Sequence, residues 1–258
     1  MLRAGVATVS RTGLTVSLDH ISFEDVIRDA DVSRSAVYRR WPYKDLFFSD
    51  LVKELAKDST PTIANDEVDL MRRVVVEHLD WLEAPGRRQS LVVELLRQLV
   101  LLDFQTVSES AGWRTYIALH ATLMSLAEGE LRDEVQVALA QSERDRISKI
   151  ATTWEQSAGL FGYRLRPELG TAFEAMATLL SATMRGLVLM ALSTPDMATH
   201  RAEASPFGAA DKGEWSLAAL GVASIATAFL EPDPAIEWNE ERLASVRQAL
   251  SCWVPPNA

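Results

Sequence analysis

The sequence has too few cysteines for a disulfide-stabilised or cysteine-ligated protein. Cys252 is the single cysteine among 258 residues, so the chain can form no internal disulfide and no zinc or iron–sulfur site that needs several cysteines. So low a cysteine content is typical of a reducing compartment. We therefore expect a cytoplasmic protein that is stabilised by its hydrophobic core, to which a chain of this length can commit many side chains.

Long hydrophobic runs and a secretory signal are also missing from the sequence. Arg or Glu interrupts each apolar stretch before it reaches the ~20 residues that span a bilayer. Residues 1–13 contain no apolar segment long enough for a signal peptide. The sequence therefore predicts a soluble chain without a membrane partner.

The sequence contains no stretch of alternating β-branched residues, whereas nearly every segment has apolar residues at helical spacing. We therefore predict an all-α fold, with residues 195–214 as the longest irregular stretch. Turn residues separate the expected helices, which are 2–12, 23–30, 34–40, 44–57, 66–83, 88–107, 112–127, 130–157, 168–193, 216–230 and 239–252.

Catalytic sequence motifs are absent as well. We find no nucleophile elbow, no Gly-rich phosphate loop and no HExxH zinc motif. We therefore expect no catalytic residue, no cofactor and no enzymatic activity. An all-α enzyme that uses an internal cavity is an alternative, but it needs a cluster of titratable residues that the sequence does not show.

The charge is unevenly distributed along the chain, whose formal net charge is −10. The first 53 residues hold eight basic and seven acidic residues, a balance of +1, while the remainder holds 18 basic and 29 acidic residues. Four basic residues are concentrated within eleven positions, together with Tyr38 and Trp41. Such a concentration indicates an element that contacts phosphates; a solvated helix face is the alternative.

Residues 22–48 predict two short helices joined by a sharp turn. Ser22 and Ser33 are the expected N-caps of the two helices, and Asp31 lies at the turn, where Asp tolerates a left-handed backbone. The first helix directs Phe23, Val26, Ile27 and Ala30 inward, and the second directs Ala36, Val37 and Trp41 inward. The pattern predicts a helix-turn-helix whose second helix exposes Arg34, Ser35, Tyr38, Arg39 and Arg40.

This stretch resembles the DNA-binding domain of the TetR family of bacterial transcriptional repressors. The positions that carry the resemblance are Val26-Ile27, Ala30-Asp31-Val32-Ser33, Tyr38, Trp41 and Lys44, followed by Leu46 and Phe47. Asp31 stands where the family usually has glycine, and Ile27 where it usually has alanine. The resemblance implies a DNA-binding domain at 1–53 and a helical ligand-binding and dimerisation domain at 54–258.

The resemblance also assigns roles on DNA. It places Arg34, Ser35 and Ala36 near the bases of the major groove, and it makes Tyr38 and Lys44 phosphate anchors. Arg34 is the expected guanine contact because its guanidinium can bond O6 and N7 together. Arg39 and Arg40 would reach either a phosphate or a base, and the alternative for each arginine is a solvated surface charge.

Two helices of the larger domain carry inward aromatic, Met and His residues. One has the stripe Met71, Val74, Val75, His78, Trp81 and Leu82, and the other Trp113, Tyr116, Ile117, His120, Met124 and Ala127. The apolar segment 91–104 is expected at the centre of the domain. We interpret His78, Trp81, Trp113, Tyr116, His120, Met124 and Met184 as lining a cavity for a small, largely apolar or aromatic effector. The alternatives are two core histidines or a shared metal ion, which lacks an acidic ligand on either stripe.

Segments 171–191 and 217–230 alternate small residues with Leu and Met. This composition favours close helix packing in a homodimeric four-helix bundle, as the resemblance implies, although both segments would also suit a monomer core. The sequence thus predicts a ligand-responsive, homodimeric repressor that binds a palindromic operator. The alternative is a small-molecule-binding protein of the same fold with weak DNA binding, since the chain is acidic and the basic arm of many relatives is nearly absent, leaving Arg3.

Overall fold

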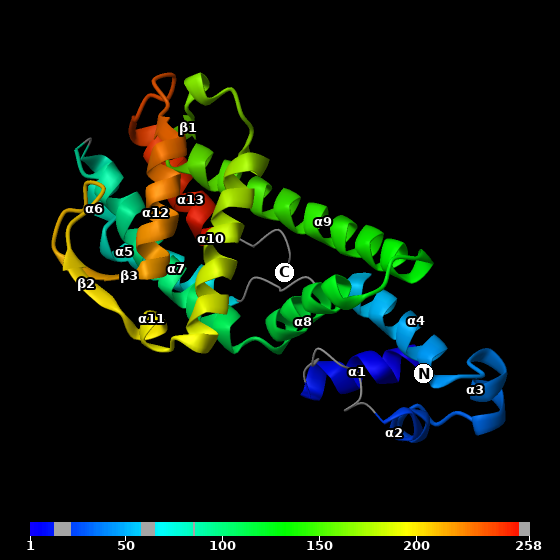
Figure 1. The fold of residues 1–258 in the computed structure, drawn as a ribbon. Coiled ribbons are helices and arrows are strands. Elements are labelled where there is room, and N and C mark those ends of the chain that lie inside the picture. The colour runs from blue at the N-terminus through cyan, green and yellow to red at the C-terminus, as the bar shows by residue number, and fades with distance from the viewer. Residues whose placement is uncertain (13–21, 58–64, 85, 253–258) are drawn as a thin grey trace. The chain divides into compact units, whose positions relative to one another are not determined.

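The computed structural model describes residues 1–12, 22–57, 65–84 and 86–252, and these are mostly helical (Figure 1). Contacts divide the chain into two compact units, one comprising residues 1–61 and 109–146 and the other residues 62–108 and 147–258. The expected boundary at residue 53 divides the chain by proposed function, whereas these two units are defined by contacts. The expected boundary therefore stays a prediction.

The first unit contains α1 (Leu2–Thr12), α2 (Phe23–Asp29), α3 (Arg34–Arg40), α4 (Lys44–Lys57), α8 (Ala111–Ser125) and the first half of α9 (Glu130–Leu160). Its core joins Phe47 and Leu51 of α4 to buried residues of α1, α2, α3, α8 and α9. Gly5 allows α1 to approach α4 closely, since a Cβ atom there would lie 2.9 Å from Leu51 Cδ1. The two short helices α2 and α3 are therefore held on a larger helical base.

The second unit contains the remaining elements, which are α5 (Asn65–Glu77), α6 (Leu79–Glu83), α7 (Arg88–Glu109), the second half of α9, β1 (Tyr163–Leu165), the 3₁₀ helix η2 (Pro167–Leu169), α10 (Phe173–Ser193), α11 (Asp196–Thr199), β2 (Arg201–Ala204), β3 (Gly213–Ser216), α12 (Leu217–Phe229), β4 (Leu230–Pro232) and α13 (Glu240–Cys252). One core cluster joins α5, α6 and α7 to Phe161 and to Val246 of α13. Buried Leu91, Val93 and Leu95 confirm that the apolar segment of α7 is central.

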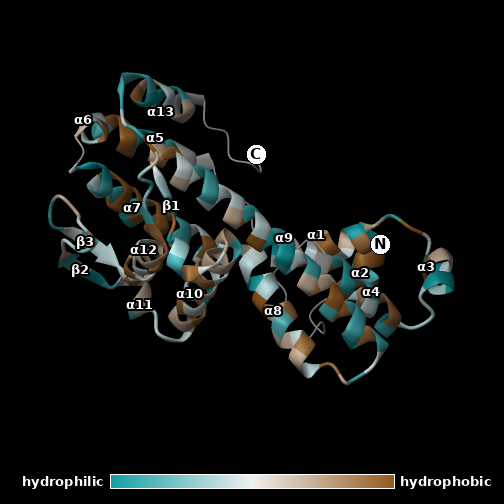
Figure 2. Ribbon diagram, turned by 90° about the horizontal axis from the view of Figure 1, so that it is seen from above, coloured by the Kyte–Doolittle hydropathy of each residue, from teal (hydrophilic) through white to brown (hydrophobic). Residues whose placement is uncertain are grey.

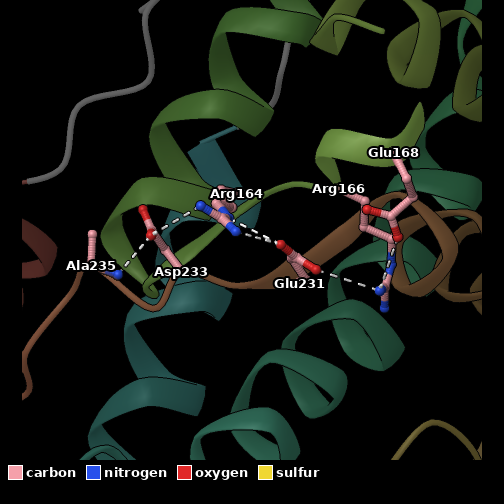
Figure 3. A network of polar contacts seen from close by, with 6 residues as sticks. All are labelled: Arg164, Arg166, Glu168, Glu231, Asp233 and Ala235. Carbon is pink, nitrogen blue, oxygen red and sulfur yellow. Dashed lines mark hydrogen bonds and ion pairs between the residues drawn. The ribbon is translucent and has the colours of Figure 1, made fainter. Parts of the chain in front are cut away.

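The all-α prediction is confirmed at the level of fold class, but the structure adds two small antiparallel sheets. Strands β1 and β4 pair with Arg164 opposite Glu231, and the two side chains form an ion pair of 2.8 Å (Figure 3). Arg166 and Asp233 extend this network at 3.6 Å from Glu231 and 3.9 Å from Arg164. Strand pairing and charge pairing thus support each other across 67 residues of chain.

The prediction that residues 195–214 are irregular is wrong, because this stretch contains α11 and most of the β2–β3 hairpin. The hairpin is attached to α7 by three hydrogen bonds. Gln89 Nε2 donates to the carbonyl of Phe207 and Ser90 Oγ to that of Gly208, each at 2.8 Å, and Arg97 Nη1 donates to the carbonyl of Glu214 at 3.1 Å. Tertiary contacts therefore order a segment whose own residues have low strand propensity.

Several expected helices differ from the observed ones in ways that have a local cause. The expected helix 66–83 is divided at His78, whose backbone (φ −122°, ψ 32°) leaves helical geometry between α5 and α6. The expected helix 168–193 begins as η2, turns at left-handed Gly170 and continues as α10. The helices at 34–40 and 44–57 have the predicted bounds.

One expectation about hydrophobic runs is wrong. Helix α10 is long and apolar enough, by length and composition, to cross a membrane, despite Arg185 in its sequence. A third of its most apolar window is buried inside the protein. A single helix of this kind is weak evidence for a membrane span, because helices that pack against other helices have the same composition.

Candidate nucleic-acid interface

The geometry of α2, the turn and α3 depends on two serine caps and one aspartate. Ser22 Oγ accepts a hydrogen bond from the Asp25 amide at 3.2 Å, and Ser33 Oγ accepts one from the Ala36 amide at 3.4 Å. Asp31 has a φ of +49° between the two helices. Both predicted caps and the predicted left-handed turn are therefore confirmed.

Helix α3 is anchored to the unit by Val37 and Trp41, and the Tyr38 ring also contacts Phe23 of α2 edge-on. Val37 is buried, and half-buried Trp41 contacts Phe47 edge-on while its Nε1 donates to Asp50 Oδ2 at 2.9 Å. The prediction that Ala36 also lies inward is wrong, because Ala36 is exposed. A helix of seven residues makes about two turns and directs few side chains toward the core. In α3 the buried side chain is that of Val37.

Every residue predicted to contact DNA is exposed in the structure. Arg34, Ser35, Ala36, Arg39 and Arg40 are exposed along the helix, and hydrophilic residues cover much of its ribbon in Figure 2. Tyr38 is exposed on the same helix, and Lys44 is exposed at the first residue of α4. The first amides of a helix and its dipole favour an anion beside this lysine.

Sequence reasoning missed Glu24, an exposed residue of α2 that contacts two of the predicted DNA-binding residues. Its Oε2 lies 2.8 Å from Arg34 Nη2, and its Oε1 accepts a hydrogen bond from the Tyr38 hydroxyl at 2.9 Å. The bond to the Glu24 carboxylate raises the pKa of Tyr38. The only available signal was the helical pattern itself, which put Glu24 on the outer face of α2 without indicating its partners.

The C-terminal half of α4 makes a charged contact with α9. Lys53 forms ion pairs with Glu134 of α9 and with Asp50 of its own helix, and the hydrogen bond to Glu134 raises the pKa of Lys53. The helix that follows α3 is therefore tied by charge to the long helix α9 within the same unit.

Four of the predicted ligand residues belong to α8. Trp113 and Tyr116 are buried and stacked with ring centroids 4.9 Å apart, and the His120 ring lies 4.1 Å from that of Tyr116. Tyr116 donates to Glu143 Oε2 at 3.1 Å. Met124 is 79% exposed, so the prediction that it lies inward is wrong, because α8 ends one residue later.

We call Trp113, Tyr116 and His120 the α8 cluster, and His120 makes one hydrogen bond within it. Its Nδ1 lies 2.9 Å from the backbone carbonyl of Tyr116. A carbonyl can only accept, so Nδ1 carries the proton. In the neutral ring this leaves Nε2 as the atom able to accept a hydrogen bond from a ligand.

The other three predicted ligand residues belong to the second unit. His78 stacks on Trp81 with ring centroids 4.1 Å apart, and Met184 is half-buried on α10. A shallow apolar depression in this unit is bordered by Phe104, Leu187, Met197 and Leu217, and it leaves no room for a water-sized molecule. No group of three or more His, Cys, Asp or Glu residues able to hold a metal ion occurs in the described part of the chain.

Helices α10 and α12 pack closely against each other but leave part of their surfaces exposed. A Cβ atom at Gly221 of α12 would lie 2.9 Å from Thr183 Cγ2 of α10, whereas one at Gly186 would meet nothing within 4 Å. The exposed residues of α10 recur at helical spacing and include Ala175, Leu179, Ala182, Leu189 and Met190. We call this stripe, together with Gly186, the α10 face.

Comparison with known proteins gave no match: no protein-family model, no curated protein and no solved structure is similar to this chain.

Proposed function

We propose that the chain is a DNA-binding transcriptional regulator in which α2, the Asp31 turn and α3 act as a helix-turn-helix. The observation that carries this proposal is the geometry of α3. One side chain, Val37, is buried, while Arg34, Arg39 and Arg40 are exposed around a helix with a capped start, and Lys44 is exposed at the first residue of α4. An exposed basic helix on a rigid support is the element that proteins place in the major groove.

The proposed roles follow from position on this element. Arg34 and Ser35, in the first turn of α3, read base edges, and Ala36 contacts a thymine methyl. Tyr38 and Lys44 bind phosphates, which set the register of the protein on the duplex. The resemblance of residues 22–48 to the TetR family supports the same assignment.

We further propose that the functional regulator is a homodimer formed through the α10 face and exposed parts of α12. An α-helix with Leu179, Leu189 and Met190 exposed to water leaves apolar area that a second copy would cover. Small residues such as Ala182 and Gly186 let two helices approach closely. A two-fold dimer also presents two copies of α3, which suits a palindromic operator.

A small apolar or aromatic effector is proposed to release the DNA, consistent with a cytoplasmic repressor. The α8 cluster supports this proposal, since it combines stacked aromatic rings with an accepting His120 nitrogen. An effector acts only if it binds one dimer geometry better than the other, and operator DNA must then weaken effector binding by the same factor.

The experiment that tests the proposed function is a gel-shift titration of the full chain. The probe is the DNA upstream of the chain's own coding sequence, with a scrambled duplex of equal length and composition as the control. Tighter binding to the upstream duplex supports the proposal. Equal binding, or none, favours the second candidate, a small-molecule-binding protein with weak DNA affinity. The net charge of −10 and the pairing of Arg34 with Glu24 support this candidate.

A further inference from the structure

The contacts of Glu24 link the two sides of the α2–α3 turn. Both carboxylate oxygens are engaged, one by the Arg34 guanidinium at 2.8 Å and the other by the Tyr38 hydroxyl at 2.9 Å. Of the other charged residues of α2, Asp25 and Arg28 pair with each other at 2.7 Å, and Asp29 pairs with Arg11 and Arg28. Glu24 is therefore the carboxylate that neutralises the start of the exposed face of α3.

The chemistry of these contacts is that of a phosphate. A phosphodiester also offers two anionic oxygens, and a guanidinium and a phenol hydroxyl are donors that bind such oxygens through charge-assisted hydrogen bonds. In the DNA-free chain, the Glu24 carboxylate occupies both donors, whereas in the proposed complex Tyr38 would bind a backbone phosphate and Arg34 a base edge.

We propose that Glu24 is an internal competitor of DNA: it holds Arg34 and Tyr38 in the free chain and must release both when the chain binds a duplex. This inference rests on the proposed DNA-binding function and adds a device that limits affinity for arbitrary sequences. After release, the carboxylate remains close to the phosphates and repels them. Sequences that give Arg34 a guanine offset this cost, whereas random sequences do not.

The exposure of the contact makes the exchange feasible. The side chains of Arg34 and Glu24 are 74% and 47% exposed, and ion pairs this accessible to water are weak. Breaking the contact therefore changes a binding constant by a modest factor, roughly two- to fivefold.

The test compares Glu24→Gln with Asp29→Asn, measured by fluorescence anisotropy on a labelled random-sequence duplex over a range of salt concentrations. Asp29 is the matched control because it lies on the same helix and forms ion pairs with Arg11 and Arg28 rather than with a residue of α3. Glu24→Gln is expected to bind roughly two- to fivefold more tightly than Asp29→Asn. Its salt dependence should be steeper by up to about one unit, since one more counterion is released.

A second measurement does not depend on DNA. In the chain labelled with ¹³C at the tyrosine ring, Tyr38→Phe identifies the Tyr38 resonance. Glu24→Gln removes the carboxylate that accepts the hydrogen bond of the Tyr38 hydroxyl, so this variant should lower the pKa of Tyr38. Asp29→Asn should leave the pKa of Tyr38 unchanged.

The outcomes separate this inference from the proposed function. If the wild-type chain binds the duplex and Glu24→Gln binds no better than Asp29→Asn, the competitor role is wrong. An unchanged pKa of Tyr38 in Glu24→Gln also overturns it. If no version of the chain binds any duplex, the proposed function itself fails and the inference fails with it.

Discussion

Individual residues of α3 and α4 have distinguishable roles in the proposed interface, because base contacts specify and phosphate contacts position. Arg34→Ala should lose roughly 1–3 kcal/mol of discrimination at one base pair. Lys44→Ala and Tyr38→Phe should weaken binding to all sequences about equally. Affinities for a set of single-base operator variants measure both effects. If Arg34→Ala and the wild type rank the operator variants in the same order of affinity, Arg34 does not read a base.

Asp31 determines the turn between α2 and α3, since its φ of +49° lies in the left-handed region. Asp31→Gly should change the free energy of unfolding by less than about 1 kcal/mol, because glycine adopts this conformation readily. Asp31→Val should cost roughly 1–2 kcal/mol, since a β-branched side chain is strained there. Urea denaturation followed by circular dichroism measures both values, and equal stability of the two variants would contradict the account.

Asp103 of α7 gives the stability a pH dependence. Burial raises the pKa of its carboxyl from 3.8 to about 6, and no charged or hydrogen-bonding group contributes to this shift. Between these two values the folded chain binds more protons than the unfolded chain, so this carboxyl makes the free energy of unfolding fall as the pH rises.

The variant Asp103→Asn removes this titration. It should match the wild type at about pH 3, where the carboxyl is protonated in both states, and exceed its free energy of unfolding at pH 8 by up to about 3 kcal/mol, since one pKa unit is worth about 1.4 kcal/mol. Urea titrations at a series of pH values provide the comparison. A difference between the two chains that is the same at every pH would show that Asp103 is ionised at its ordinary pKa.

Among the elements, α10 and α12 provide the clearest distinction between a packed and an exposed glycine. Gly186→Trp points into open space in the single chain and should convert a dimer to a monomer while helix content is retained. Gly221→Trp collides with Thr183 and should instead destabilise the fold, by about 1–3 kcal/mol or more. Light scattering and circular dichroism distinguish the two results.

Exposed Ala244 on α13 supplies the matched control for the bulky substitution. Ala244→Trp should leave both the molar mass measured by light scattering and the helix content equal to those of the wild type. The proposed α10 interface is wrong if the wild-type chain is monomeric at micromolar concentration. It is also wrong if Gly186→Trp and Ala244→Trp form assemblies of the same molar mass in solution.

The elements that could be predicted from sequence are those determined by local residues. Ser22, Ser33 and Asp31 act on backbone within three residues of themselves, so the caps and the turn of α2 and α3 follow from the sequence. The β2–β3 hairpin depends on hydrogen bonds from Gln89 and Ser90, which lie 118 residues away. A helical pattern contains no information about such partners, and it missed the contacts of Glu24 for the same reason.

At the scale of the whole molecule, the two compact units divide the predicted site residues. The DNA-contacting residues and the α8 cluster with His120 belong to the first unit, while His78, Trp81 and the α10 face belong to the second. Periodicity identified inward aromatic residues in both units, but it could not assign them to one cavity, since helix faces do not specify which helices pack together. The proposed regulator would use the first unit to read DNA and the second to dimerise.

The central claim is that two copies of α3 in one dimer read DNA, and the most direct test is selection of bound duplexes from a random-sequence pool by the full chain. The account predicts enrichment of an inverted repeat whose half-sites are centred about one helical turn, roughly 10 base pairs, or more apart. Arg34→Ala should then relax one symmetric pair of positions in that repeat. A pool that stays random after repeated rounds, or that yields a motif unchanged by Arg34→Ala, would contradict the account.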